Sequence, residues 1–90
     1  MGIKISVTSY LQPFTANAET AEVSGSTVGE CLAQLVQAFP ALEKMLFDKK
    51  GRLHSYVGIY VNGEDAFPQD LAKAVKDGDE LYIQYTISGG

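Results

Sequence analysis

Residues 27–39 read TVGECLAQLVQAF, and this stretch decides the fold. Thr27 with a glutamate three residues later forms a capping box, which marks the start of a helix. Apolar residues then recur at spacings of three and four, and they form one continuous helical stripe: Val28, Cys31, Leu32, Leu35, Val36 and Phe39. Proline disfavours helical backbone at the residue before it, so Pro40 is expected to end the helix near Phe39. The stretch predicts one amphipathic helix that needs an apolar partner layer.

Two alternating stretches precede this helix. Residues 3–11 place apolar side chains on one side and polar ones on the other, and this period of two predicts a half-buried strand. Pro13 is expected to end that strand because proline cannot donate to a ladder. Residues 19–23 predict a second strand, and Asn17 is a suitable turn residue between the two. The chain is therefore expected to begin with a hairpin that has a long tip.

The pattern after the helix predicts the rest of a sheet. Residues 41–47 suit a short second helix, and residues 57–61 alternate as a third strand. Asn62-Gly63 is the strongest short turn signal in the chain, and a brief return strand is expected at residues 65–67. Residues 81–87 alternate again and predict the last strand.

This order of elements predicts an α+β fold of the β-grasp, or ubiquitin-like, type. A mixed sheet of four to five strands would be covered on one face by one main helix. The first and last strands are the most apolar on one side, so they are expected to lie side by side and parallel at the centre. The expected organisation is one β-grasp domain over residues 1–87 and a flexible Ser-Gly-Gly tail over residues 88–90.

Composition argues against several classes of function. The chain has 90 residues, a net charge of −4 and no basic run longer than Lys49-Lys50, so a nucleic-acid partner is not expected. No apolar stretch approaches the length that crosses a membrane, so no membrane partner is expected either. The single cysteine rules out an intrachain disulfide. Because its start lacks the charged leader and the long apolar run of a signal peptide, the chain is expected to be cytoplasmic.

No side-chain active site can be assembled from the sequence. His54 is the single histidine, and Cys31 lies within the apolar stripe of the helix, where core packing is the expected role. The acidic turn Asp77-Gly78-Asp79-Glu80 lacks the spaced ligands of a calcium loop, and no glycine-rich phosphate loop is present. We therefore expect neither an enzyme nor a bound metal or cofactor.

The last residues carry the remaining chemical signal. The final strand is followed by Ser88-Gly89-Gly90. Glycine lacks a Cβ, so a Gly-Gly segment can enter a narrow slot and approach a nucleotide closely. The α-carboxylate, with an ordinary pKa of about 3.3–3.7, is ionised at neutral pH and can act as an oxygen nucleophile. Gly90, supported by Gly89, is the predicted reactive position.

Three motifs make the whole chain resemble the ubiquitin-like sulfur-carrier family (MoaD/ThiS). They are the helix entry Thr27-Val28-Gly29-Glu30, the Asp77-Gly78-Asp79-Glu80-Leu81 turn into the last strand, and Gly89-Gly90. Residues 53–65 resemble most closely the branch that contains the cysteine-biosynthesis sulfur carrier. Many relatives carry prolines shortly before Gly-Gly, whereas this chain has Gln84-Tyr85-Thr86-Ile87-Ser88, which leaves the identity of the fitting partner open.

The resemblance implies a mechanism. A ubiquitin-activating-type adenylyltransferase would use ATP and Mg²⁺ to attach AMP to the Gly90 carboxylate. A sulfur donor would then displace AMP and leave a C-terminal thiocarboxylate. The sulfur would pass to an accepting enzyme, which is cysteine-synthase-like by first expectation and the molybdopterin synthase large subunit by second, with thiamin thiazole synthesis third. The sulfur donor and the oligomeric state are not predicted.

Docking residues are expected beside the tail. The sheet face away from the helix should present Tyr60, Tyr82 and Gln84, which together with Ile87 and Ser88 are the predicted partner contacts. Cross-strand pairing of the two tyrosines explains their placement equally well. Two other functions stay open: a ubiquitin-like modifier conjugated through Gly90, and a non-catalytic β-grasp interaction domain.

Overall fold

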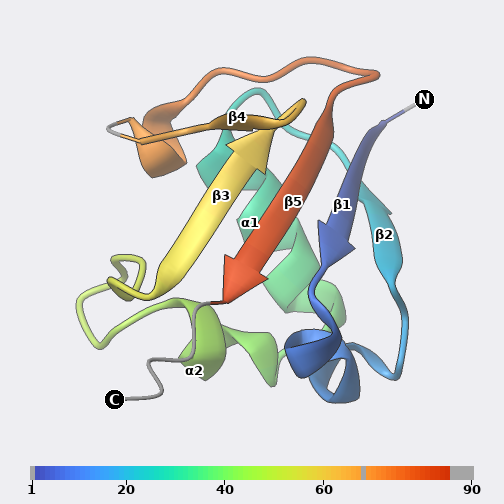
Figure 1. Ribbon diagram of the computed structural model, residues 1–90, viewed down its shortest axis with the longest axis vertical. Coiled ribbons are helices and arrows are strands. Elements are labelled where there is room, and N and C mark those ends of the chain that lie inside the picture. The colour runs from blue at the N-terminus through green and yellow to red at the C-terminus, as the bar shows by residue number, and fades with distance from the viewer. Residues whose placement is uncertain (1, 68, 86–90) are drawn as a thin grey trace.

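The computed structural model of the protein describes residues 2–67 and 69–85. Its strands are β1 (Ile3–Val7), β2 (Thr20–Val23), β3 (Val57–Val61), β4 (Glu64–Asp65) and β5 (Glu80–Tyr85). Its helices are α1 (Val28–Ala38) and α2 (Leu42–Leu46), with two 3₁₀ segments, η1 (Ser9–Thr15) and η2 (Asp70–Ala72). Figure 1 shows the strands as one sheet with α1 behind it, so the predicted β-grasp architecture is confirmed.

Within the described residues the sheet has five strands in the order β2-β1-β5-β3-β4. β1 and β5 pair in parallel, with Ile5 opposite Leu81 and Val7 opposite Ile83. β1 pairs with β2, and β3 with β5, in antiparallel fashion. The last strand therefore lies in the middle of a mixed sheet, as predicted, with β1 on one side and β3 on the other.

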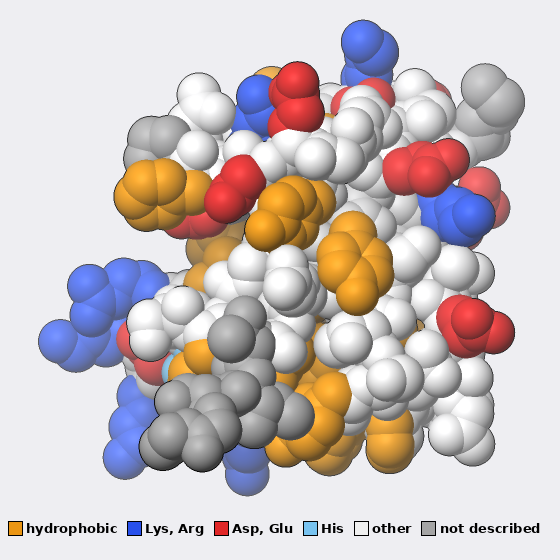
Figure 2. Space-filling view, viewed as in Figure 1, with side chains coloured by type: hydrophobic (Ala, Val, Ile, Leu, Met, Phe, Trp, Pro, Cys, Tyr) orange, Lys and Arg blue, Asp and Glu red, His pale blue; other side chains and the backbone are white. Residues whose placement is uncertain are grey.

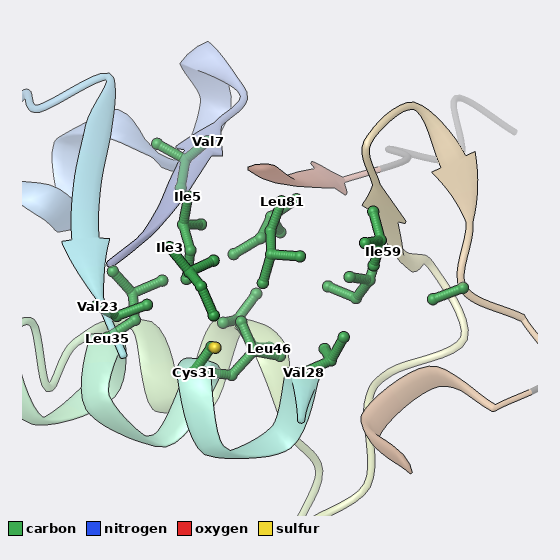
Figure 3. Packing of buried hydrophobic residues seen from close by; sticks show 14 of the residues in the cluster. Ile3, Ile5, Val7, Val23, Val28, Cys31, Leu35, Leu46, Ile59 and Leu81 are labelled. Atoms are coloured by element: carbon green, nitrogen blue, oxygen red, sulfur yellow. The ribbon is translucent and has the colours of Figure 1, made fainter. Parts of the chain in front are cut away.

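The core lies between the sheet and α1. Figure 3 shows Val28, Cys31 and Leu35 pointing from α1 toward apolar side chains of the strands. Among them Ile5 and Ile59 are 0% exposed, as are Cys31 and Leu35 on the helix. Burial of each such side chain stabilises the fold by about 1.5–3 kcal/mol, so this layer holds the sheet and the helix together.

The start of α1 matches the predicted cap with one change. The Thr27 side chain accepts a hydrogen bond from the backbone N–H of Glu30 at 3.2 Å. The Glu30 carboxylate reaches past Thr27 to Ser26, whose backbone N–H and hydroxyl donate to it at 2.7 and 2.9 Å. These two bonds, the backbone one first, lower the pKa of Glu30. The Glu30 side chain thus bonds to Ser26, one residue before the N-cap, and not to the N-cap residue Thr27 as in the standard capping box.

Gly29 allows α1 to lie close to η2. A Cβ at this position would come within 3.2 Å of the carbonyl oxygen of Leu71. Backbone oxygen cannot yield easily, so a larger residue would push η2 away from the helix. This contact explains why glycine stands in the helix entry Thr27-Val28-Gly29-Glu30.

The first strand is shorter than predicted. The sequence pattern extended it over residues 3–11, but β1 ends at Val7 and residues 9–15 form η1. The backbone N–H of Leu11 donates to the carbonyl of Thr8 at 2.9 Å, which turns the chain and buries Leu11 in the core. Pro13 lies inside η1, and Asn17 has the positive φ of a turn residue.

The Asn62-Gly63 turn joins β3 to β4 as predicted. Both residues have positive φ, 51° and 85°, as a two-residue hairpin requires. Asn62 also donates from its amide to the Asp79 carboxylate at 3.1 Å, and this bond is the largest cause of a lowered pKa at Asp79. The return strand is Glu64–Asp65 rather than residues 65–67, because the Asp65 carboxylate accepts from the Phe67 N–H and turns the chain.

Replacing Thr27 with alanine should lower the free energy of unfolding by about 1 kcal/mol, because the Glu30 N–H then loses its acceptor. Denaturant titration of the purified protein measures this difference. Thr27→Ser keeps the acceptor oxygen and is the matched control, for which little loss is expected. Equal stability of the alanine variant and the wild type would show that the cap contributes nothing.

Candidate functional site at the end of the last strand

The predicted reactive segment, Ser88-Gly89-Gly90, follows β5 in the sequence. Ile87, Ser88, Gly89 and Gly90 lie outside the described residues, and so does the predicted boundary between domain and tail. Tyr85 is the last described residue of β5. The site is therefore built from the side chains that surround Tyr85 and from the sheet face beside it.

Three tyrosines meet at the end of β5. The ring of Tyr85 stacks on Tyr10 with centroids 5.0 Å apart and meets Tyr56 edge-on, also at 5.0 Å. Tyr10 comes from η1 and Tyr56 directly precedes β3, so the chain is held from both sides where the C-terminal segment starts. Stacked and edge-on ring pairs stabilise by about 0.5–1.5 kcal/mol beyond their buried area. We call Tyr10, Tyr56 and Tyr85 the tyrosine clamp.

The clamp perturbs the Tyr85 hydroxyl. Burial, followed by the neighbouring Tyr56 hydroxyl, raises the pKa of Tyr85 to about 12. The sequence did not predict this cluster, since its three members are separated by tens of positions. The available signal was the apolar side of the last strand, on which Tyr85 follows Leu81 and Ile83.

The sheet face turned away from α1 presents the predicted docking residues. Tyr82 and Gln84 are exposed on β5, and Tyr60 on β3 is half-buried. Tyr60 and Tyr82 are directly opposite partners, so they form a cross-strand pair as well as a surface. Figure 2 shows hydrophobic side chains gathered over β3 and β5 on this face.

A hollow lies beside this pair. Gly58 is the strand partner of Gln84, and because glycine has no side chain, the space next to Gln84 stays open. The hollow has a volume of about 470 Å³ and is bordered by Tyr60, Gln84 and Phe67. Phe67 is 73% exposed, which adds apolar surface to the rim.

The two residues considered for side-chain chemistry have structural roles. Cys31 is fully buried, and burial raises the pKa of its thiol, which leaves it protonated at neutral pH. His54 stacks on Tyr56 with centroids 4.8 Å apart, and its Nε2 lies 3.1 Å from the Lys44 carbonyl oxygen. His54 thus packs against the Tyr56 ring of the clamp.

The described residues contain no group of three or more His, Cys, Asp or Glu side chains arranged to hold a metal ion. Within residues 2–67 and 69–85, no helix is long and apolar enough to cross a membrane.

Comparison with known proteins assigns the chain to a family. The profile of the ThiS family matches residues 6–90. The chain belongs to the ThiS family. The match includes the clamp residues Tyr10, Tyr56 and Tyr85 and runs through the Gly-Gly segment. The predicted resemblance to ubiquitin-like sulfur carriers is thereby confirmed.

Named relatives support this membership of the ThiS family. The sulfur carrier protein CysO of Mycobacterium tuberculosis is 34% identical over 93 residues, an alignment that covers 100% of both chains. Small archaeal modifier protein 1 of Haloferax volcanii is 39% identical over 84 residues, covering 81% of this chain and 93% of that protein. The crystal structure of the Amycolatopsis orientalis BexX/CysO complex contains a chain with 30% identity and a TM-score of 0.88, covering 98% and 99% of the two chains.

The tyrosine clamp should make stability depend on alkaline pH. A tyrosine whose folded pKa is raised above its ordinary value of 10 favours folding below pH 10, and this contribution is lost as pH rises toward 12. In Tyr85→Phe the free energy of unfolding should fall less steeply over that range than in the wild type, as measured by denaturant titration at several pH values. Tyr82→Phe, on the opposite face, should keep the wild-type slope. Identical slopes for Tyr85→Phe and the wild type would contradict the assignment.

Proposed function

We propose that this ThiS-family protein is a sulfur carrier whose Gly90 carboxylate is converted to a thiocarboxylate. The observation that carries the proposal is the full-length match to a protein named as a sulfur carrier, 34% identical with 100% of both chains covered. The Gly-Gly segment lies within the matched region. The protein itself contributes no catalytic side chain and acts as a co-substrate.

The chemistry proceeds in two steps on a partner enzyme. The Gly90 carboxylate attacks the α-phosphorus of ATP, pyrophosphate leaves with Mg²⁺, and an acyl adenylate forms. A sulfide-level sulfur donor then attacks the acyl carbon and AMP leaves, so that sulfur replaces one carboxylate oxygen. The adenylyltransferase supplies the groups that bind the phosphates and the metal.

The structure supports this role through the position of the last strand. β5 lies between β1 and β3, and the tyrosine clamp holds it at Tyr85, five residues before Gly90 in the sequence. A fixed base allows a partner to bind the folded domain and receive the following segment in a narrow channel. Restricting the orientation of the reactants in this way lowers the entropic cost of reaction.

The sheet face gives the adenylyltransferase a place to dock. Tyr82 and Gln84 lie within three residues of Tyr85 and are exposed, and Tyr60 extends the same surface across β3. Aromatic side chains beside a hollow are typical of protein interfaces. Among acceptors, a cysteine-synthase-like enzyme is proposed first because of the CysO relative, and the molybdopterin synthase large subunit is the alternative.

A second candidate function is protein modification through Gly90. Its support is the 39% identity to small archaeal modifier protein 1. Both functions begin with adenylation of Gly90 and diverge afterward, since a modifier ends in an isopeptide bond to a lysine. Cell extract probed with an antibody against this protein separates them, because a modifier gives slowly migrating conjugates that disappear when Gly90 is deleted.

Incubation with the host adenylyltransferase, ATP and sulfide should raise the intact mass by the difference between one sulfur and one oxygen. Deletion of Gly90 should abolish the gain because the reactive carboxylate is then misplaced. Gly90→Val should also abolish the gain, because a side chain at this position does not fit a narrow slot in the enzyme. Its far-ultraviolet circular dichroism spectrum should match that of the wild type. A mass gain that persists in both variants would refute the proposed attachment point.

The docking role of the sheet face has its own test. Tyr82→Ala should lower kcat/KM for adenylation about tenfold, the effect expected of an interface aromatic. Gln37→Ala on the exposed side of α1 is the control and should retain the wild-type value. Equal kcat/KM values for the two variants would show that the Tyr60–Tyr82 pair stabilises the sheet and takes no part in docking.

A further inference from the structure

The positive charges of this acidic protein gather in one segment. Residues 43–52 contain four of the seven Lys and Arg residues and two carboxylates, a net charge of +2 in a chain whose net charge is −4. Figure 2 shows these cations grouped at one side of the molecule, at the end of the sheet opposite the Asn62-Gly63 turn. The acidic residues Glu64, Asp65 and Glu80 lie at that other end.

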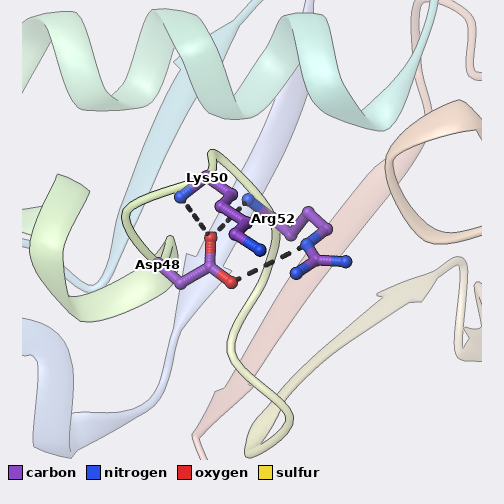
Figure 4. A network of polar contacts seen from close by, with 3 residues as sticks. All are labelled: Asp48, Lys50 and Arg52. Carbon is purple, nitrogen blue, oxygen red and sulfur yellow. Dashed lines mark hydrogen bonds and ion pairs between the residues drawn. The ribbon is translucent and has the colours of Figure 1, made fainter.

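The Asp48 carboxylate of this segment already has partners within the segment. The Asp48 carboxylate accepts from the backbone N–H groups of Lys50 and Arg52 at 2.8 and 3.0 Å, and lies 3.8 Å from the Arg52 guanidinium (Figure 4). These contacts, with the Arg52 N–H first, lower the pKa of Asp48. Asp48–Arg52 is the one ion pair found in residues 2–67 and 69–85, so no described carboxylate pairs with Lys44, Lys49 or Lys50.

An apolar groove runs beside these lysines. It has a volume of about 840 Å³ and lies between α1 and residues 43–54. Its apolar lining comes from Ala33 and Val36 on α1 and from Phe47. Its charged lining consists of two lysines and two carboxylates: Lys44, Lys49, Glu43 and Asp48. Val36 and Phe47 are half-buried against the core, so the apolar lining is held rigidly while it faces solvent.

Aromatic contacts link the groove to Tyr85 on β5. His54 lines the groove, stacks on Tyr56, and Tyr56 contacts Tyr85 at the end of β5. Two ring contacts therefore connect the groove to the residue after which the C-terminal segment starts. His54 also borders the hollow beside Tyr60, so a partner that docks on the sheet face and receives this segment has the groove within reach.

We infer that this groove binds an acidic segment of the enzyme that adenylates Gly90, a conclusion that rests on the proposed function. An apolar side chain of that segment packs against Val36 and Phe47, and its carboxylates lie against Lys44 and Lys49. Charge complementarity favours this occupant, because residues 43–52 carry a net charge of +2 and the Asp48 carboxylate in the groove lining is already paired with Arg52. Glu43 offsets only one of the two lysines of the lining.

The test is ATP–pyrophosphate exchange, which reports adenylation, with the host adenylyltransferase and each variant as substrate. Lys44→Glu/Lys49→Glu should raise KM about tenfold and leave kcat unchanged, because docking weakens while the chemistry stays intact. The increase should shrink at high salt, which screens exposed charges. Lys73→Glu/Lys76→Glu, an equal change of charge at the other end of the sheet, should leave KM unchanged.

The apolar half of the groove is tested separately. Ala33 is exposed on α1, so Ala33→Glu should fold normally and raise KM by placing a carboxylate in the groove. Ala38→Glu, exposed on the same helix outside the groove, is the control. Equal KM values for the groove variants and their controls, with wild-type exchange intact, would overturn the docking site alone. Absence of exchange with the wild type, when the enzyme activates its known carrier, would overturn the proposed function and this inference together.

Discussion

The parallel pairing of β1 with β5 is the constraint on which the rest of the molecule depends. It places the last strand between the first strand and β3, so both neighbours hydrogen-bond to it. Ile83 at its centre is fully buried under α1. Pairing between strands so far apart in the sequence has to overcome the entropy of closing a long loop. The segment that follows β5 is therefore presented by the folded domain and not by any local element.

The spacing of apolar side chains along the sequence was sufficient to predict a sheet covered by one helix. The stripe on α1 and the alternation in β3 and β5 depend on burial on one side, and burial is what the sequence pattern records. The alternation predicted a strand as far as Leu11, but it breaks at Ser9, which is polar at an apolar position, and residues 9–15 form a 3₁₀ segment. There the hydrogen bond from Leu11 to Thr8 decides the conformation, and no side-chain period signals it.

The candidate site was predictable only where it follows a strand. Tyr60, Tyr82 and Gln84 share a face because side chains alternate, so their exposure away from α1 could be inferred. The clamp and the apolar groove beside α1 could not be predicted, because both join residues from separate elements. Tyr10 meets Tyr85 only after β1 and β5 are in register, and Lys44 comes beside Val36 only after α2 packs near α1.

The tyrosine clamp also limits how far Gly90 can reach from the folded domain. Five residues follow Tyr85 as far as Gly90, and an extended chain covers at most about 3.3–3.6 Å per residue, so Gly90 extends no more than roughly 18 Å from the clamp. Any reaction at Gly90 must occur within that radius of Tyr85. A partner with a deeper active site would have to open before it could react, whereas one with a shallower site would leave slack in the chain. Under the proposed function, the clamp therefore limits the depth of an active site that Gly90 can enter.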